Sequence, residues 1–230
     1  MRMISWEKLP PQMQTEAVKP YYEILQKKQI SLIFKRLFDI VVSLIMLLIL
    51  SPVFLILAIA IKLDTEGPVF YRQVRVTQYG KEFRIFKFRT MVNNADKIGS
   101  QVTVGGDNRI TRVGKVIREC RLDEIGQLLN ILGGSMTFVG TRPEVPKYVE
   151  KYTPEMWATL LLPAGVTSEA SIRYKDEAAL LDAAEDIDAT YFQDVLPGKM
   201  KYNLRSIQEY SFFKDIETMF QTVFVVVDKD

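Results

Sequence analysis

The 230-residue sequence contains no histidine and a single cysteine, Cys120. The missing histidine excludes every Ser-His-Asp or Cys-His nucleophile arrangement and every zinc site with a histidine ligand. One cysteine cannot form an internal disulfide bond, which is typical of a protein in a reducing compartment. We expect Cys120 to be a small buried hydrophobic residue. Any catalysis must therefore use carboxylates, lysine, arginine, hydroxyl groups or a hard metal ion.

The sequence also lacks a strong net charge and the glycine loops that bind nucleotides. Its formal net charge is +2, so no overall field indicates a nucleic-acid partner. A P-loop and a Gly-x-Gly-x-x-Gly after a strand are both absent, so neither fold built on them is supported. The charge is uneven, because Lys62–Arg89 is mainly basic and Asp176–Asp194 is purely acidic among its charged residues. The basic block suits anionic lipid or phosphate.

What the sequence does contain is a long uncharged segment, Ile40–Ile61, in which only Ser43 and Ser51 are polar. As a helix it would run ~33 Å at ~1.5 Å per residue, enough to cross a hydrocarbon core of ~30 Å. Pro52 removes one helical hydrogen bond in its middle. Basic clusters flank both ends, and such clusters belong on the cytoplasmic side. A re-entrant helix bent at Ser51-Pro52, with Ser51 bonding a freed carbonyl, satisfies this rule, and a straight span is the alternative.

Aromatic and β-branched residues predict one β-hairpin, with strands over Val69–Val76 and Phe83–Arg89. The phenylalanines of the second strand share one face, so Lys87 and Arg89 can present two cations on the other. This pattern indicates an anion site, and attraction to the membrane surface is the alternative explanation.

Two helices are predicted over Thr111–Glu119 and Asp123–Leu132, the second opening with Asp123 and Glu124. The helix dipole and the neighbouring arginines, including Arg118, should keep both carboxyl pKa values low. Adjacent side chains on a helix diverge, so one acid can react with a phosphoryl group while the other binds a metal. An ordinary acidic first turn is the simpler explanation of the pair taken alone.

Two further motifs carry charge. A turn with one glycine and two prolines, residues 140–146, holds Arg142, and a rigid guanidinium binds phosphate well, although it can also merely cap a helix. Asp186-Ile187-Asp188 fits the metal-binding Asp-x-Asp pattern of many glycosyltransferases. Because the long α/β nucleotide-binding half of those enzymes is missing, we interpret Asp186 and Asp188 as part of a solvated loop.

Together these motifs resemble the bacterial sugar transferase family, the monotopic phosphoglycosyl transferases, in their small minimal-domain form. The resemblance covers roughly Leu32 to Val225. It rests on an ordered set: Lys35-Arg36-Leu37-Phe38-Asp39, Ser51-Pro52, Gly67-Pro68-Val69-Phe70, Lys87-Phe88-Arg89-Thr90-Met91, Leu122-Asp123-Glu124, Arg142-Pro143 and Pro163-Ala164-Gly165-Val166-Thr167.

The fold expected from the residues and the resemblance is α+β and mostly helical. It comprises an N-terminal surface-helix region (1–31) with its helix over Gln12–Gln29, a re-entrant membrane helix broken at Ser51-Pro52 (32–62) and a cytoplasmic catalytic domain (63–230). That domain should contain a small β-hairpin and two closing helices, over Ala189–Tyr202 and Ser206–Val227. The last is partly amphipathic and would lie along the membrane surface, and packing on the domain core is the alternative.

The resemblance also implies a site. Asp123 would be the nucleophile and Glu124 its partner, both with Mg²⁺. Lys87, Arg118 and Arg142 would bind the substrate phosphates, with Arg173 as a fourth cation, and we add Arg89 from the hairpin. Two departures affect these roles. Thr141 replaces a proline of the family's Gly-Pro-Arg-Pro turn, and the residues around Arg173 differ from the family's pattern.

The implied reaction moves a sugar-1-phosphate from a UDP-sugar to polyprenol phosphate and releases UMP, through an aspartyl-phosphosugar. It would occur at the bacterial inner membrane, with both termini cytoplasmic, as the first membrane step of a glycoconjugate pathway. Direct attack by the lipid phosphate is an alternative route. A lipid-binding scaffold and a glycosyltransferase that uses Asp186 and Asp188 are alternative functions. The sequence predicts neither the sugar nor the oligomeric state.

Overall fold

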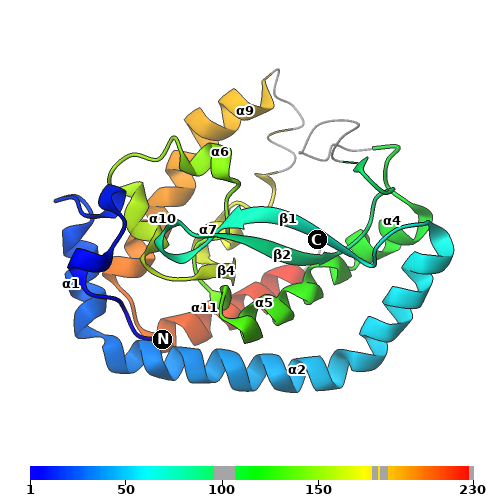
Figure 1. Ribbon diagram of the computed structural model, residues 1–230, viewed down its shortest axis with the longest axis horizontal. Coiled ribbons are helices and arrows are strands. Elements are labelled where there is room, and N and C mark those ends of the chain that lie inside the picture. Colours follow the sequence, from blue (N-terminus) through cyan, green and yellow to red (C-terminus); the bar gives the residue numbers. More distant parts are fainter. Residues whose placement is uncertain (96–106, 178–180, 182–185, 228–230) are drawn as a thin grey trace.

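The computed structural model describes residues 1–95, 107–177, 181 and 186–227, which are mostly helical with two small sheets (Figure 1). This agrees with the predicted fold class at that level. The helices are α1 (Lys19–Lys27), α2 (Gln29–Asp64), α4 (Arg112–Glu119), α5 (Gln127–Gly133), α6 (Pro146–Val149), α7 (Glu169–Arg173), α9 (Ile187–Thr190), α10 (Leu196–Gln208) and α11 (Phe212–Val227). The strands are β1 (Phe70–Val76), β2 (Glu82–Phe88), β3 (Met136–Val139) and β4 (Ala164–Thr167).

The uncharged segment lies within α2, a continuous 36-residue helix that is long and apolar enough to cross a membrane. Pro52 has no N–H to donate to the carbonyl of Leu48, four residues earlier. The Ser51 hydroxyl donates to that carbonyl instead, at 2.8 Å, as the sequence predicted. Figure 1 shows α2 running beneath the rest of the chain and then bending upward toward α4. A proline is the usual cause of such a bend.

The two halves of α2 pack on different hydrophobic clusters. The first half contributes residues such as Phe38 to a cluster with α5, β3 and β4. The second half places Leu57 and Ile61 against Phe88 of β2 and Ile117 of α4. Most of the remaining surface of α2 is apolar and exposed, and only 11% of its most apolar stretch is buried. This exposure excludes the helix as the buried core element of a soluble domain.

Charged residues near the start of α2 hold it to the domain. Lys35 is 3% exposed and donates to Asp215 at 2.6 Å and to the Val139 carbonyl at 2.7 Å. Asp39 is 1% exposed and accepts from the Thr137 hydroxyl and the Phe138 N–H. We call Lys35, Asp39 and Asp215 the α2 clamp. Lys35 therefore belongs to the interior and not to a basic flank facing lipid.

The hairpin is confirmed, with β1 and β2 antiparallel and Phe70 opposite Phe88. A second sheet pairs β3 with β4 in parallel and was not predicted. All four residues of β3 are buried, including Thr137, so the strand has no solvent-exposed face and is too short to be recognised from its sequence.

Other elements differ from the sequence prediction at their ends. The expected N-terminal helix over Gln12–Gln29 begins only at Lys19, after two short 3₁₀ turns, and its inner face packs into the core. The first closing helix, expected over Ala189–Tyr202, is α9, a π turn and α10, which together reach Gln208. Cys120 is exposed, so the prediction of a buried hydrophobic residue is wrong.

Candidate active site

The hairpin carries Lys87 to the site. In β2, Phe88 is 2% exposed and packs between Phe54 of α2 and Phe70 of β1. Because side chains alternate along a strand, burial of this phenylalanine directs Lys87 to the other face. Tyr71 of β1 lies directly opposite Lys87. The long apolar helix thus fixes the position of a cation through one packed aromatic residue.

The acidic pair lies in a 3₁₀ turn, Leu122–Gly126, that leads into α5. Arg121 adopts a left-handed conformation (φ 54°), which ends α4 and turns the chain into this segment. Gly126 then lets the turn approach β2, because a Cβ there would lie 3.0 Å from the Phe86 carbonyl oxygen. The predicted helix start at Asp123 is thus a tight turn pressed against the hairpin.

A parallel-strand connection holds Arg142. The Gly140 N–H donates to the Thr167 carbonyl at 2.9 Å, and the Gly165 N–H donates to the Thr141 carbonyl at 2.8 Å. A Cβ on Gly165 would lie 2.2 Å from Gly140 backbone atoms, so this close approach requires glycine. Backbone pairing with β4 therefore constrains the turn in which Thr141 stands where the family often has proline.

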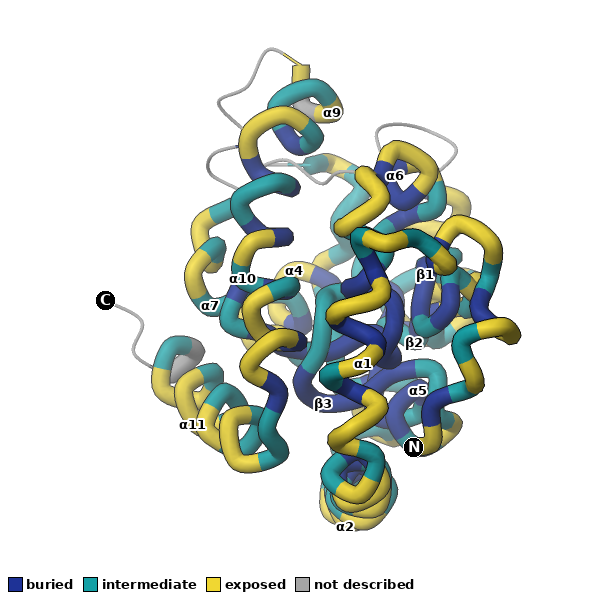
Figure 2. Tube along the Cα trace, turned by 90° about the vertical axis from the view of Figure 1, so that its left-hand side faces the viewer, coloured by how far each residue is buried: buried dark blue, intermediate teal, exposed yellow. Residues whose placement is uncertain are grey.

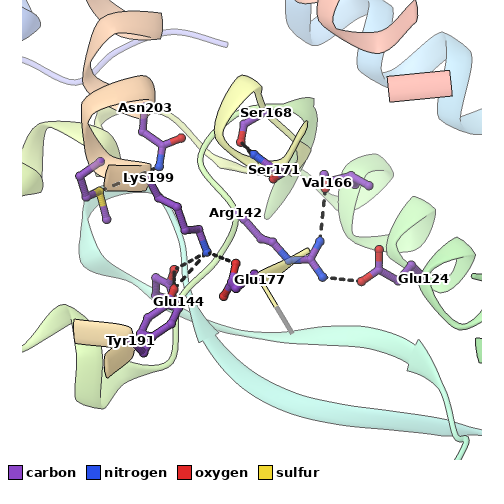
Figure 3. Close-up of polar contacts among 11 residues, drawn as sticks. Glu124, Arg142, Glu144, Val166, Ser168, Ser171, Glu177, Tyr191, Lys199 and Asn203 are labelled. Carbon is purple, nitrogen blue, oxygen red and sulfur yellow. Dashed lines mark hydrogen bonds and ion pairs between the residues drawn. The ribbon is translucent and has the colours of Figure 1, made fainter. Parts of the chain in front are cut away.

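These three segments bring two acids and two cations together, and Figure 3 shows the contact between Glu124 and Arg142. Glu124 Oε1 lies 2.5 Å from Arg142 Nη2 and 3.0 Å from Lys87 Nζ. Lys87 Nζ is also 3.9 Å from Asp123 Oδ2. The four side chains are between 19% and 40% exposed. We call Asp123, Glu124, Lys87 and Arg142 the carboxylate cluster.

The two carboxyl groups have opposite pKa shifts. Burial raises the pKa of Asp123, although the charges of Lys87 and Arg118 oppose this effect. Burial also acts to raise the pKa of Glu124, but the charges of Arg142 and Lys87 outweigh it and hold this pKa well below its usual range. The expectation of a low pKa is therefore wrong for Asp123. The two acids differ because the cations bond Glu124 more closely.

Arg118 is a third cation beside the carboxylate cluster. Its charge acts on the carboxyl group of Asp123. Its Nη1 atom is buried and has no hydrogen-bond partner among the described residues. A buried donor without a partner is costly, and a bound anion would satisfy it. This buried donor therefore supports an anionic ligand at the site.

Two predicted phosphate ligands lie elsewhere. Arg89 is 5% exposed, and its guanidinium donates to the carbonyls of Thr65, Glu66 and Pro68 at 2.7–2.8 Å. It closes the loop between α2 and β1, so its donors are already used. Arg173 is exposed on α7, near the Tyr202 ring, and lines a separate cavity of ≈ 770 Å³ beside α10 and α11.

Asp186 and Asp188 have local partners in the structure. Asp186 accepts from the Ala189 N–H at 3.0 Å, and Asp188 accepts from Lys147 and Tyr148. Within the described ranges, no group of three or more Asp, Glu or Cys side chains could hold a metal ion. These contacts give both aspartates a structural role.

Sequence reasoning missed a polar network next to Arg142. It contains Glu144, Glu177, Tyr191 and Lys199, which come from four separate segments (Figure 3). Only Glu144, two residues after Arg142, could have been suspected from its position in the sequence.

The carboxylate cluster fits one mode of magnesium binding. Mg²⁺ often takes one or two protein carboxylates and completes its shell with water and substrate phosphates. Asp123 and Glu124 supply two such groups. Since Glu124 already bonds two cations, Asp123 is the carboxylate with more freedom to serve as a ligand.

The family model described as "Bacterial sugar transferase" matches residues 30–229. The chain belongs to the bacterial sugar transferase family. The matched range covers nearly all of α2, both sheets and the whole carboxylate cluster.

Several curated members of the bacterial sugar transferase family are similar to the chain. A "UDP-N-acetylgalactosamine-undecaprenyl-phosphate N-acetylgalactosaminephosphotransferase" from Aeromonas hydrophila is 35% identical over 82% of this chain and 42% of the relative. A "UDP-glucose:undecaprenyl-phosphate glucose-1-phosphate transferase" from Klebsiella pneumoniae is 36% identical over 85% and 40%. One of the same description from Caulobacter vibrioides is 32% identical over 82% and 68%. The chain spans about two fifths of the length of the first two.

Proposed function

We propose that the chain transfers a sugar-1-phosphate from a UDP-sugar to undecaprenyl phosphate and releases UMP. The arrangement of Asp123 and Glu124 among Lys87, Arg118 and Arg142 supports this most strongly. Two phosphate-bearing substrates require several fixed cations, and these residues supply them without any histidine. Relatives whose names describe the transfer of a sugar phosphate to undecaprenyl phosphate are similar to this chain over most of its length.

The two carboxylates would have different roles in this reaction. Glu124, held by Arg142 and Lys87, keeps both cations in position for the diphosphate. Asp123 has the raised pKa and so the more basic oxygen, which suits a nucleophile. Its oxygen would attack the β-phosphorus and form an acyl phosphate as the bond to the UMP oxygen breaks. The lipid phosphate oxygen would then displace Asp123 from the same phosphorus.

Magnesium is part of the proposal. A bound Mg²⁺ would neutralise charge on the diphosphate and on the departing UMP. Asp123 and Glu124 are the residues that would hold it. Lys87, Arg118 and Arg142 would bind the phosphate oxygens that the metal leaves free.

We further propose that α2 is re-entrant. Its first half is held by the α2 clamp and its second half by the cluster around Phe88, so both ends lie against the same domain. A straight span would have to break one of these packed contacts. Exposed apolar residues of α11, namely Phe213, Phe220, Val223 and Phe224, would add to the membrane surface. Figure 2 shows α11 and α2 toward the same end of the molecule.

UMP release tests the activity. The purified chain, in nanodiscs with undecaprenyl phosphate and Mg²⁺, is incubated with a panel of UDP-sugars. We expect UMP and a lipid-linked sugar phosphate from at least one donor. Release of UDP instead would favour the glycosyltransferase alternative, and no release from any donor would favour a lipid-binding scaffold.

Thiol labelling in sealed vesicles tests the topology. Cys120 is first changed to serine, and exposed positions before and after the uncharged segment are changed separately, Lys27→Cys and Glu66→Cys. We expect both thiols to react with a membrane-impermeant reagent from the same side. Labelling from opposite sides would show a spanning helix.

A further inference from the structure

A second pocket adjoins the carboxylate cluster on the far side of Arg142. Its volume is ≈ 200 Å³. Gln73 and Arg75 of β1 line it, together with Arg142, Glu144, Glu177 and Lys199. Figure 3 shows Glu124 on one side of the Arg142 guanidinium and Glu177 with the Lys199 network on the other. Arg142 is therefore shared between the two sites.

The polar groups of this pocket are fixed by buried contacts. Lys199 is 5% exposed, and its Nζ lies 3.0 Å from Glu177 and 3.1 Å from the Tyr191 hydroxyl. The Tyr191 hydroxyl donates to Glu144. Tyr191 in turn packs on the ring of Tyr148. Such a network presents donors and acceptors in set positions, as a site that reads hydroxyl groups requires.

The charges here are nearly balanced, unlike those at the carboxylate cluster. The cations that line the pocket are Arg75, Arg142, Lys147 and Lys199. The carboxylates that line it or pair with these cations number the same: Glu124, Glu144, Glu177 and Asp188. A phosphate would meet the repulsion of Glu144 and Glu177, whereas an uncharged group with many hydroxyls would not.

Size and position narrow the ligand further. Pockets for drug-sized ligands measure about 300–1,000 Å³, so a pocket of ≈ 200 Å³ suits one ring and not a whole UDP-sugar. In a UDP-sugar, a single ester oxygen joins the sugar to the β-phosphate. A sugar must therefore lie directly beside the cation that binds this phosphate, and Arg142 borders both sites.

Resting on the proposed function, we propose that this pocket binds the sugar ring of the donor. Arg75 and Gln73 project from the same face of the hairpin as Lys87, because residues two apart in β1 share a face and Tyr71 lies opposite Lys87. The hairpin thus runs from the reacting phosphate to the sugar. The Arg75 side chain lines the pocket near the charge of Glu144, where its guanidinium can donate to sugar oxygens.

Kinetics with and without the sugar test this assignment. In Arg75→Gln, we expect kcat/KM for the accepted UDP-sugar to fall at least tenfold, while the inhibition constant of UDP stays within twofold. UDP carries both phosphates and the nucleoside but no sugar. Gln73→Ala should also lower kcat/KM for the UDP-sugar without changing the inhibition constant of UDP, but by a smaller factor. This variant replaces Arg75→Gln in the test if Arg75→Gln folds poorly. Arg72→Gln, whose side chain stacks on Phe86 on the other face, is the control and should change neither value.

Two results would overturn the assignment, and a third would overturn the function on which it rests. Parallel losses in UDP-sugar turnover and UDP affinity would place the nucleotide or the diphosphate in the pocket. Unchanged kinetics in both hairpin variants would leave the pocket without a role in donor binding. Absence of UMP release by the unaltered protein would instead refute the proposed function itself.

Discussion

Two clusters in this chain bring carboxylates and cations together but differ in how completely their charged groups are paired. In the α2 clamp, Lys35 and Asp39 are 3% and 1% exposed, and each makes two hydrogen bonds to the domain. In the carboxylate cluster, Asp123 is 19% exposed and Lys87 lies 3.9 Å from it, beyond hydrogen-bond distance. The neighbouring Arg118 has a buried nitrogen without a partner in the described chain.

We interpret the α2 clamp as structural, and we propose that the carboxylate cluster is reactive. In a closed cluster, every charged group already has hydrogen-bond partners within the protein, so the cluster serves only to hold elements together. An open cluster contains charged groups that lack hydrogen-bond partners, which lowers the stability of the fold. Such groups are typical of sites where a ligand supplies the missing partners. Both clusters match motifs of the family, so the motifs alone do not reveal which charges bind substrate.

The largest expected effect belongs to Asp123→Asn. Because the variant removes the proposed nucleophile, kcat for UMP release should fall by on the order of 10⁴-fold or more. The fold should tolerate it. Folding raises the pKa of Asp123, so ionisation of this carboxyl at higher pH lowers the stability of the folded protein. The Asp123→Asn variant has a neutral amide there, and its melting temperature at pH 7 should match or exceed that of the wild type. A large drop in melting temperature would assign Asp123 to the structure.

Lys35→Met should show the opposite pattern. It leaves Asp215 buried without its cation, and breaking a buried ion pair costs about 3–5 kcal/mol. We expect a matching loss in the free energy of unfolding, measured by denaturant titration in detergent, and proportional activity in the fraction that remains folded. Lys27→Met, an exposed lysine on α1, is the control. A stable but inactive Lys35→Met would contradict the clamp.

Arg142→Lys tests whether the guanidinium fork matters. Lysine keeps the charge but cannot contact Glu124 and the Val166 carbonyl with two nitrogens at once. We expect kcat/KM to fall about 10²-fold, the usual effect of losing one positioned donor. Arg112→Lys, an exposed arginine on α4, should leave kinetics unchanged. Equal activity in both variants would show that Arg142 acts only as a point charge.

Acidification should reduce activity through Asp123 and not through Glu124. As the proposed nucleophile, Asp123 would have to be ionised to attack, and burial raises its pKa. Glu124 keeps a lowered pKa and stays ionised over the same range. The pH profile of kcat/KM should therefore fall about tenfold per pH unit below a single pKa that lies above the usual value of about 3.9 for aspartate. A flat profile down to pH 4 would contradict this assignment.

The smallest effect is expected from Ser51→Ala. Without the hydroxyl, the Leu48 carbonyl loses its donor beside Pro52, at a cost of about 1 kcal/mol. Thermal unfolding in nanodiscs measures the loss, and Ser51→Thr, which keeps the hydroxyl, should restore it. Equal stability of all three proteins would show that the bend needs no side-chain hydrogen bond.

The sequence predicted features that depend on local chemistry. The uncharged segment with its Ser51-Pro52 bend and the aromatic pattern of the hairpin can be read from neighbouring residues. The acidic pair and Arg142 were identified individually, and the resemblance grouped them. Sequence periodicity could not show that β3 pairs with β4, because both are short and largely buried. Nor could the sequence show that Lys87 lies at the site while Arg89 does not. The Arg89 guanidinium bonds three backbone carbonyls that come together only in the folded loop.

The pocket beside Arg142 was outside the reach of sequence analysis for a related reason. Its polar groups come from β1, the loop before α6, the segment after α7, and α10. No spacing in the chain relates Glu144 to Lys199. Their proximity depends on packing across the main hydrophobic core, which only the three-dimensional structure defines.

The most direct test of whether Asp123 in the carboxylate cluster is the nucleophile is a single-turnover experiment without the lipid acceptor. The protein is mixed with Mg²⁺ and an accepted UDP-sugar, quenched, digested and analysed by mass spectrometry. We predict about one UMP per protein molecule and a sugar-phosphate adduct on the peptide that contains Asp123. UMP release that requires undecaprenyl phosphate, with no adduct on Asp123 at any time point, would contradict its role as the nucleophile.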